Sequence, residues 1–337
     1  MYKLQKITLL LTLLITSLFS EVNQLNTAID NIVLTHNEKL QSKKIIISIM
    51  DSKSGNILYI NNKNIAASFL YEPGSVMIPI SISMAIDMNK IQLDNKHYYS
   101  NIRFKHKTIK LSPKKIVIDS KNIESSLIAQ MISGKEFYYG YKAFGFSKKT
   151  GIDIKNEVNG NIPKLYSYTR KECCTKNMFR ATTSYGYGMT ATHLQLLKAY
   201  TVFNNDGRIT TPKLDKIKII PYQKSIIQHS TTTIMKEFLI ANIKNKIEKN
   251  NISNSLQFGG KEASANIFEN GKDSKKYINS FFGFVNDKKG NKYSIGITVI
   301  EPLIAKQKSN NSYSNPIISI FEEVINTMVG LKLLKTI

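Results

Sequence analysis

Tryptophan is absent from the sequence, cysteine occurs only twice, and 24 acidic residues stand against 47 basic ones. So few cysteines exclude a disulfide-dense scaffold. No cysteine and histidine residues have the spacing of a structural zinc site, so we expect neither a metal nor a cofactor. The chain also lacks an apolar run of about 18 residues, which leaves no obvious membrane span. The chain does contain 42% hydrophobic and 9% aromatic residues, which predict a folded core. Its length of 337 residues is more than one small domain needs and less than three domains need.

The excess of basic residues gives a formal net charge of +23, which raises the hypothesis of a nucleic-acid partner. The densest basic segment, Arg103–Lys115, contains no acidic residue and alternates in part with apolar residues, a pattern typical of a solvated face. No RNA-recognition, zinc-finger or helix-turn-helix pattern accompanies it. We therefore predict that no nucleic acid is bound. A composition rich in lysine, asparagine and isoleucine, or attraction to an anionic envelope polymer or membrane surface, explains the charge equally well.

The first 20 residues have the order of a secretory signal. Lys3 and Lys6 precede the apolar stretch Ile7–Phe19, which is shorter than the about 20 residues of a spanning helix. Residues 1–20 are therefore predicted to be a signal peptide, and the folded part to lie in the periplasm or on the outer face of the inner membrane. Leu18 is large for its place near a cleavage site, so an uncleaved inner-membrane anchor is the alternative. A cytoplasmic location would instead revive the hypothesis of a DNA-binding protein.

Two further residue types carry no predicted chemistry. Cys173 and Cys174 are adjacent, and neighbouring cysteines rarely bridge each other without strain, so we expect ordinary loop side chains. The histidines show no metal spacing and are predicted to be surface or cap residues: His36, His97, His106, His193 and His229.

Strand patterns occur at both ends of the chain, with mainly helical patterns between them. Residues 21–42 are predicted to form a lead-in helix, because apolar residues recur there at helical spacing. Ile45–Met50 and Asn56–Ile60 predict one hairpin, and Tyr277–Val285 and Lys292–Ile300 predict another. A short strand near Lys261, a capping box at Thr192-x-x-Gln195 and a closing helix after Pro316 complete the pattern. The simplest assembly is an α+β fold in which one antiparallel sheet is built from both chain ends, with a helical lobe inserted and a site in the groove between.

Five segments occur in a telling order: YEPGS at Tyr71–Ser75, SKN at Ser120–Asn122, FGFSKKTGIDIKNEVNG at Phe144–Gly160, ATTSYGYGMTATHLQLLKAY at Ala181–Tyr200, and GGKEAS at Gly259–Ser264. Together they resemble the transpeptidase domain of class B penicillin-binding proteins, over roughly residues 40 to 330. Class D β-lactamases share the three-motif logic, but the two long strings look like the transpeptidases. The resemblance places the domain at residues 43–337.

The resemblance implies a five-stranded antiparallel sheet flanked by helices plus an all-helical lobe. It also implies D,D-transpeptidation, in which a serine attacks the D-Ala-D-Ala end of a peptidoglycan stem peptide, or a β-lactam, and forms an acyl-enzyme. By resemblance, Ser75 stands at the nucleophile position, and Ser120 and Asn122 form the S-x-N motif. Lys261 matches the lysine of K-T-G and binds substrate together with Ser264.

Three positions depart from the family pattern. The S-x-x-K lysine, which takes the proton from the serine, is replaced by Ile78, and K-T-G is replaced by Lys261-Glu262-Ala263. Isoleucine cannot accept a proton, and a serine hydroxyl without a base is a poor nucleophile near neutral pH. Glu262 adds a carboxylate where the family binds one, unless it points away as strand neighbours alternate. At the third position a methyl group on Ala263 intrudes where glycine allows close approach.

The retained motif residues also have plainer interpretations. Ser120 and Asn122 are candidates for helix caps, and Tyr185–Gly188 for a tight turn that supports packing. The other S-x-x-K, Ser112–Lys115, lacks the EPGS context and is predicted to cap a helix as a decoy.

Two hypotheses for function follow. The first is an impaired family member that acts by binding a stem peptide, peptidoglycan or a cell-wall synthesis protein. The second is an active serine D,D-transpeptidase or carboxypeptidase with a substitute base. We favour the first, because Ile78 removes a group that the mechanism needs.

Overall fold

The computed structural model describes residues 23–93, 100–104, 107–169, 177–214, 223–244, 246–247, 252–269, 272–303 and 316–336. The predicted signal peptide, both cysteines, His97 and His106 lie outside these ranges. Within them, no helix is both long and apolar enough to cross a membrane.

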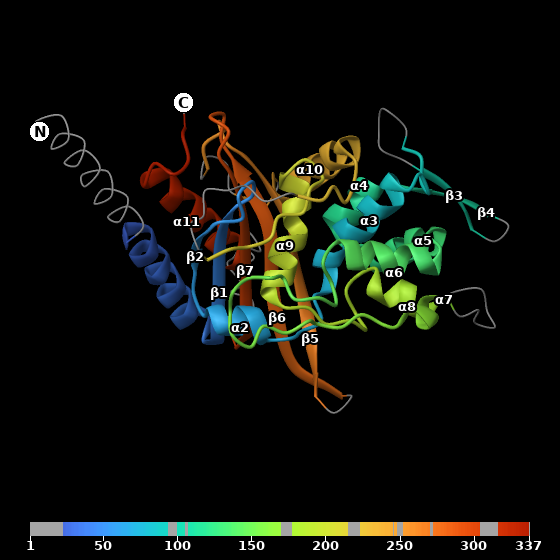
Figure 1. The fold of residues 1–337 in the computed structure, drawn as a ribbon, viewed down its shortest axis with the longest axis horizontal. Coiled ribbons are helices and arrows are strands. Elements are labelled where there is room, and N and C mark those ends of the chain that lie inside the picture. Colours follow the sequence, from blue (N-terminus) through green and yellow to red (C-terminus); the bar gives the residue numbers. More distant parts are fainter. Residues whose placement is uncertain are drawn as a thin grey trace, which may run out of the picture.

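One antiparallel sheet is built from both ends of the chain, with strand order β2-β1-β7-β6-β5 (Figure 1). Its strands are β1 (Ser42–Asp51), β2 (Ile57–Ile60), β5 (Gln257–Glu269), β6 (Lys272–Asn286) and β7 (Lys292–Pro302). The predicted α+β class with a five-stranded antiparallel sheet is therefore confirmed. β5 is longer than the short strand predicted near Lys261, and it forms one edge of the sheet.

Helices occupy the middle of the chain and its two ends. Residues 23–40 are helical. A short 3₁₀ turn, η1 (Gly74–Met77), runs directly into α3. The α-helices are α2 (Lys63–Ser68), α3 (Ile78–Asp87), α4 (Pro113–Asp119), α5 (Asn122–Met131), α6 (Gly134–Ala143), α7 (Leu165–Thr169), α8 (Met178–Thr183), α9 (His193–Asn204), α10 (His229–Lys244) and α11 (Pro316–Gly330).

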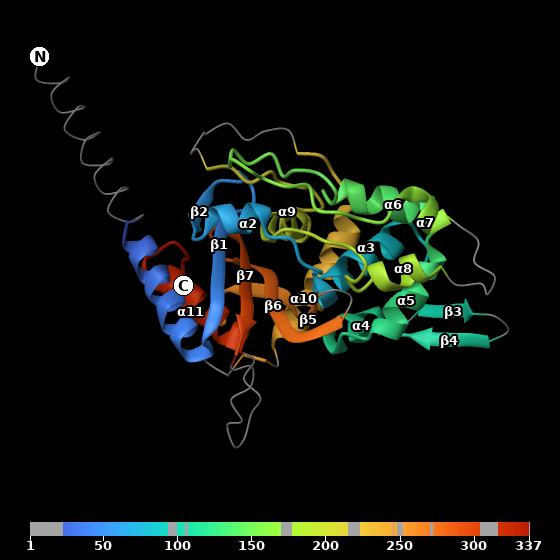
Figure 2. The same ribbon diagram turned by 90° about the horizontal axis from the view of Figure 1, so that it is seen from below.

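The sheet separates two hydrophobic clusters, because successive residues of a strand point to opposite faces. Ile45, Ile47 and Ile49 of β1 pack with the helix of residues 23–40 and with α11. Ile46 of the same strand packs on the other side, with α9 and the helical lobe. Figure 2 shows the same layering, with α11 and the first helix on one side of the sheet and the lobe of α3 and α5–α8 on the other.

The first helix is also held by polar contacts. The Tyr59 hydroxyl donates to Asp30 Oδ1 at 2.5 Å, and His36 Nε2 lies 2.9 Å from Glu323 Oε1 of α11. The N-terminal helix and the C-terminal helix are thereby fixed to the same face of the sheet.

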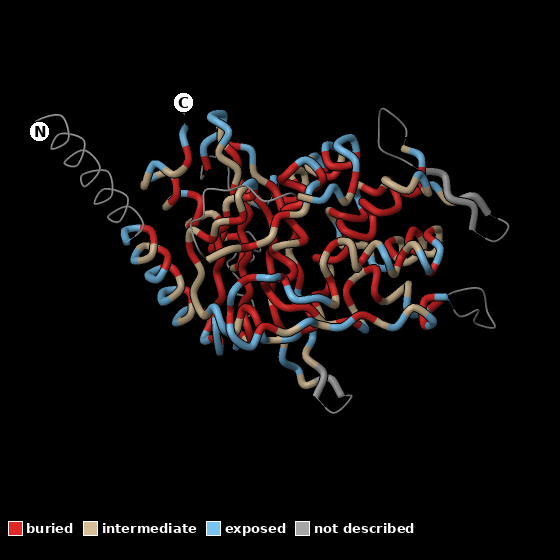
Figure 3. The backbone as a smooth tube through the Cα atoms, in the orientation of Figure 1, coloured by how far each residue is buried: buried red, intermediate tan, exposed pale blue. Residues whose placement is uncertain are grey.

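α3 is the central helix of the lobe, and its residues from Ile78 to Ile86 are all buried. A helix that is apolar around most of its circumference is stable only inside a core. Figure 3 shows this burial running from the sheet into the lobe, whereas the outer side of the first helix is exposed.

The basic segment Arg103–Lys115 spans a hairpin and the start of a helix. Its first part forms the hairpin of β3 (Ser100–Phe104) and β4 (Lys107–Leu111), and the rest begins α4. The Ser112 side chain accepts a hydrogen bond from the Lys115 N–H at 3.3 Å, so the prediction that Ser112 caps a helix is confirmed. The capping box of Thr192 and Gln195 is also confirmed, at the start of α9.

Candidate functional site

Ser75 lies in η1, at the point where the chain enters α3, and its side chain is half-buried. Gly74 has φ +64°, and its N–H donates to Gly186 O at 3.2 Å. A Cβ added at Gly186, which has φ +86°, would lie 2.2 Å from Gly74 O, so only glycine fits there. Tyr185–Gly188 is therefore a tight turn, as predicted, and it supports the backbone that carries Ser75.

Glu72 fixes the same turn from the other side. Its Oε1 accepts a hydrogen bond from the Gly188 N–H at 2.8 Å. Burial raises the pKa of the Glu72 carboxyl, and the Gly188 N–H partly opposes this effect. The sequence YEPGS thus places a carboxylate that holds the turn three residues before the serine.

Ile78 begins α3, has 0% exposure and belongs to the large hydrophobic cluster of the lobe. No base among the described residues forms a hydrogen bond with the Ser75 hydroxyl. Ile78 is therefore packed hydrocarbon, which can neither accept nor donate a proton.

Ser120 and Asn122 lie at the junction of α4 and α5. Ser120 ends α4 with φ +53° and is half-buried, and Asn122 is the exposed first residue of α5. The N-cap of α5 is Lys121, which makes no side-chain cap hydrogen bond. The interpretation as helix caps is therefore confirmed for Ser120, which is the C-cap of α4, and not for Asn122, because Lys121 is the N-cap of α5.

Lys261 and Glu262 form a charged cluster on β5. The Lys261 side chain has 0% exposure, and its Nζ donates to Glu262 O at 3.0 Å and to Glu262 Oε1 at 3.2 Å. The Glu262 carboxylate also accepts from Asn242 Nδ2 at 2.8 Å and pairs with Lys246, just after the end of α10. Glu262 therefore lies against α10, and its charge is paired with those of Lys261 and Lys246.

The two partners shift each other's protonation. Burial lowers the pKa of the Lys261 amine, although the Glu262 carboxylate pulls in the opposite direction. Burial acts to raise the pKa of Glu262, but Lys261 and Lys246 outweigh it and hold that pKa below its ordinary value. The cluster is thus a carboxylate stabilised by two cations.

Small side chains bring β5 next to the serine. A Cβ built on Gly74 would lie 3.2 Å from Ala265 Cβ and 3.5 Å from Ala263 Cβ, so η1 packs closely against this strand. Ala263 is buried, while Ser264, its neighbour, is exposed. The structure therefore brings Ser75 beside the K-E-A segment, as the motif order predicts.

Tyr200 of α9 contacts the serine loop. Its hydroxyl donates to Val76 O at 2.7 Å, one residue after Ser75. Burial raises the pKa of Tyr200, and the negative charge of Glu262 raises the same pKa further.

Two histidines differ from the prediction of surface or cap residues. His193 is buried, with Nε2 2.8 Å from Ser48 Oγ and Nδ1 2.8 Å from Thr298 Oγ1, because the first turn of α9 faces the sheet. Burial lowers the pKa of His193 to about 3, so the ring is neutral near pH 7. His36 is buried against α11, whereas His229 is exposed. No group of histidine, cysteine or carboxylate side chains in the described ranges could hold a metal ion.

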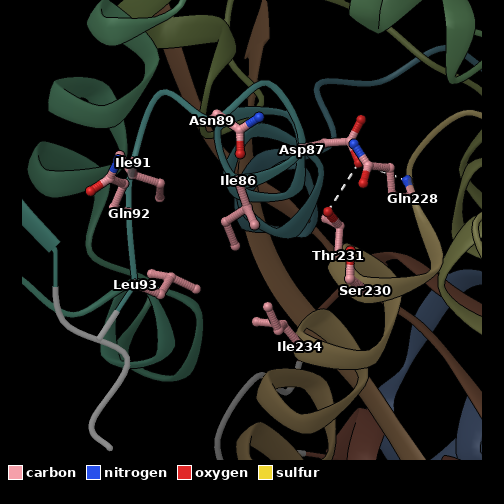
Figure 4. Close-up of a pocket in the computed structure, with 10 residues that line it drawn as sticks. All are labelled: Ile86, Asp87, Asn89, Ile91, Gln92, Leu93, Gln228, Ser230, Thr231 and Ile234. Atoms are coloured by element: carbon pink, nitrogen blue, oxygen red, sulfur yellow. Dashed lines mark hydrogen bonds between the residues drawn. The ribbon is translucent and has the colours of Figure 1, made fainter. Parts of the chain in front are cut away.

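A cavity of about 730 Å³ lies at the other end of α3 (Figure 4). None of the predicted site residues lines it. Its one ionisable side chain, Asp87, accepts from the Gln228 N–H at 2.6 Å and from Thr231 Oγ1 at 3.0 Å. Asp87 thereby holds the start of α10, which is a structural role, and the cavity is not the candidate site.

Sequence patterns did not identify Tyr200, Asn242 or Lys246 as part of the site. Asn242 lies in the last turn of α10, and Lys246 lies four residues later, in the turn that follows the helix. That spacing was visible, but nothing in the sequence indicates that these residues meet β5.

Residues 45–325 match the model of the penicillin binding protein transpeptidase domain. The chain belongs to this family, and the resemblance seen in its motifs is confirmed.

Two curated relatives are identical to this chain at about a quarter of the aligned positions. The chain is 24% identical to the probable peptidoglycan D,D-transpeptidase PenA of Neisseria flavescens over 321 residues, which cover 86% of this chain and 76% of the relative. It is 25% identical to the protein of the same name from Neisseria meningitidis over 288 residues, which cover 78% of this chain but only 48% of the relative. The chain therefore spans about half of the second relative.

Solved structures agree in fold. The transpeptidase domain of Burkholderia pseudomallei penicillin-binding protein 3 superposes with a TM-score of 0.74 at 20% identity, covering 92% of this chain and 94% of that one. Penicillin-binding protein 3 of Mycobacterium tuberculosis, in complex with aztreonam, superposes with a TM-score of 0.75 at 16% identity, covering 93% and 79%.

Proposed function

We propose that this protein is an exported, catalytically impaired transpeptidase-domain protein that acts in the cell envelope by binding peptidoglycan stem peptides or a partner of cell-wall synthesis. The observation that carries the proposal is Ile78, which is fully buried at the position of the family's proton-accepting lysine. General base assistance contributes about 10²–10⁴-fold to such reactions, so its loss alone makes acylation slow.

The retained polar residues support binding. Ser75, Ser120 and Asn122 keep side chains that can donate and accept hydrogen bonds, and none of them is fully buried. Residues 1–20 as a signal peptide or inner-membrane anchor, and residues 43–337 as the binding domain, complete the proposal. The site would then face the compartment that contains peptidoglycan.

One observation favours the alternative, an active D,D-transpeptidase or carboxypeptidase with a substitute base. Burial lowers the pKa of the Lys261 amine, and a lysine with a lowered pKa is more often neutral near pH 7, the form that can accept a proton. Against it, the Lys261 amine donates both of its hydrogen bonds to Glu262 rather than to Ser75.

Covalent labelling with a fluorescent penicillin separates the two hypotheses. We expect the purified protein to form no stable adduct, and to be retained on peptidoglycan sacculi. A stable adduct that disappears in Ser75→Ala but persists in Ser112→Ala would overturn the impaired assignment. If Lys261→Met then abolished that adduct in a folded protein, Lys261 would be the substitute base.

A further inference from the structure

Three side chains converge on one carboxylate beside the serine loop. Lys246 Nζ, Lys261 Nζ and Asn242 Nδ2 all point their donors at Glu262, and they come from three places: the turn after α10, β5 and α10 itself. Ammonium and amide donors around two oxygens are the standard recognition chemistry of a carboxylate. The arrangement is therefore a carboxylate-binding site whose occupant belongs to the same chain.

The donors are ordered independently of the carboxylate. Asn242 Nδ2 also donates to Gly260 O at 2.8 Å, and Lys246 Nζ donates to Asn242 Oδ1 at 2.8 Å. Because these contacts do not involve the Glu262 side chain, the donor set has its own framework.

In this arrangement the buried cation directs two of its three N–H donors at Glu262. Lys261 is fully buried and forms hydrogen bonds only with Glu262 among the described residues. The Lys246 side chain is 31% exposed, so its ammonium group is partly solvated. A ligand carboxylate arriving here would meet the Glu262 carboxylate first, and like charges in close contact repel.

We propose that Glu262 occupies, from within the chain, a carboxylate-binding site formed by Lys261, Lys246 and Asn242, and thereby directs the candidate site at Ser75 toward ligands whose terminal group is neutral. The second half rests on the proposed function, since it concerns what the candidate site binds. The ligand class is then a peptide that presents no free carboxylate to the site, such as a peptide with a C-terminal amide or an internal peptide segment.

The first test examines the carboxylate site without any peptide. Glu262→Ala leaves the three donors in place, and we expect sodium acetate to raise its thermal unfolding temperature in a saturable way, relative to sodium chloride at equal ionic strength. Glu38→Ala is the matched control, because Glu38 is an exposed acid on the first helix and has no part in the cluster. An equal response to acetate in both variants and the wild type, or no response in any, would overturn the proposal.

The second test uses Glu262→Gln, which keeps the side-chain shape and so guards against an Ala variant that fails to fold. Binding of N-acetyl-D-alanyl-D-alanine is compared with binding of its C-terminal amide by calorimetry. We expect the wild type to prefer the amide by about tenfold and Glu262→Gln to lose or reverse that preference. An unchanged ratio would sink the selectivity. If the wild type binds neither peptide, the stem-peptide form of the proposed function fails, while the acetate experiment still decides whether the carboxylate site exists.

Discussion

The two walls of the candidate site differ in kind. The α3 wall, with Ile78, is packed hydrocarbon, whereas the β5 wall concentrates Lys261, Glu262 and Lys246. On the first wall Ile78 offers no group that exchanges protons, and on the second the charged groups contact one another within the chain. The difference teaches that the two walls respond differently to substitution, because displacing one side chain frees charged groups only on the second.

Ile78→Lys tests the apolar wall and has the largest expected effect. An amine placed in the lobe core has no described acidic partner there, so we expect a loss of about 4 kcal/mol in the free energy of unfolding, measured by urea denaturation at pH 7. The loss should shrink toward pH 10, because the amine is then increasingly neutral in both states. Ile78→Met is the apolar control, with an expected cost below about 1.5 kcal/mol.

A different result would show that this wall is not closed. If Ile78→Lys were as stable as Ile78→Met and also formed a penicillin adduct at Ser75, the groove would have kept room for the base, and Glu262 and Ala263 would not block acylation.

Gly186→Ala tests the support of the serine loop. The added Cβ would lie 2.2 Å from Gly74 O and 2.4 Å from Gly74 N, at φ +86°, and we expect a cost of about 3 kcal/mol. Gly188→Ala is matched, because φ is +70° but the nearest atom, Thr182 Oγ1, is 3.5 Å away, so only about 1 kcal/mol is expected. Equal unfolding midpoints in the two variants would argue against the close backbone contact.

Glu262→Gln tests the charged wall through pH. Because the folded-state pKa of Glu262 lies below its ordinary value, its ion pairs add stability above the ordinary pKa, and this stability is lost as the pH falls through the folded pKa. We expect Glu262→Gln to cost about 2 kcal/mol at pH 7 and progressively less on acidification. A difference from the wild type that stays constant down to pH 3 would contradict the ion-pair description.

The smallest effect separates a cap from a site residue. Ser112→Ala should cost about 1 kcal/mol, because it removes the side-chain acceptor at the start of α4. Ser120→Ala should change the unfolding free energy by less than about 0.5 kcal/mol, since no cap bond is lost, but should weaken retention on sacculi. The reverse pattern would make Ser112 the functional serine and Ser120 the structural one.

Much of the fold was predictable from local pattern. The hairpins at both ends, the helix after Pro316 and the Thr192 capping box depend on residues that are near each other in sequence, and the order of the long motifs predicted that Ser75 would lie beside β5. The β3–β4 hairpin was missed, because its basic residues indicated solvent exposure and not strand pairing.

The electrostatic detail of the site was not predictable. The sequence left two orientations open for Glu262, and the one adopted depends on Asn242 and Lys246, about 20 and 16 positions earlier, meeting β5. His193 was expected to be a surface or cap residue, because the histidines show no metal spacing, yet it is buried against the sheet. Such contacts follow from how elements dock and not from the pattern within any one of them.

The packing of the first helix beside α11 has a geometric consequence. Residue 23 and the end of α11 lie on the face of the sheet opposite the one that packs against the serine loop. If the proposed membrane anchor precedes this helix, the lipid would lie on the α11 side of the sheet and Ser75 on the opposite side.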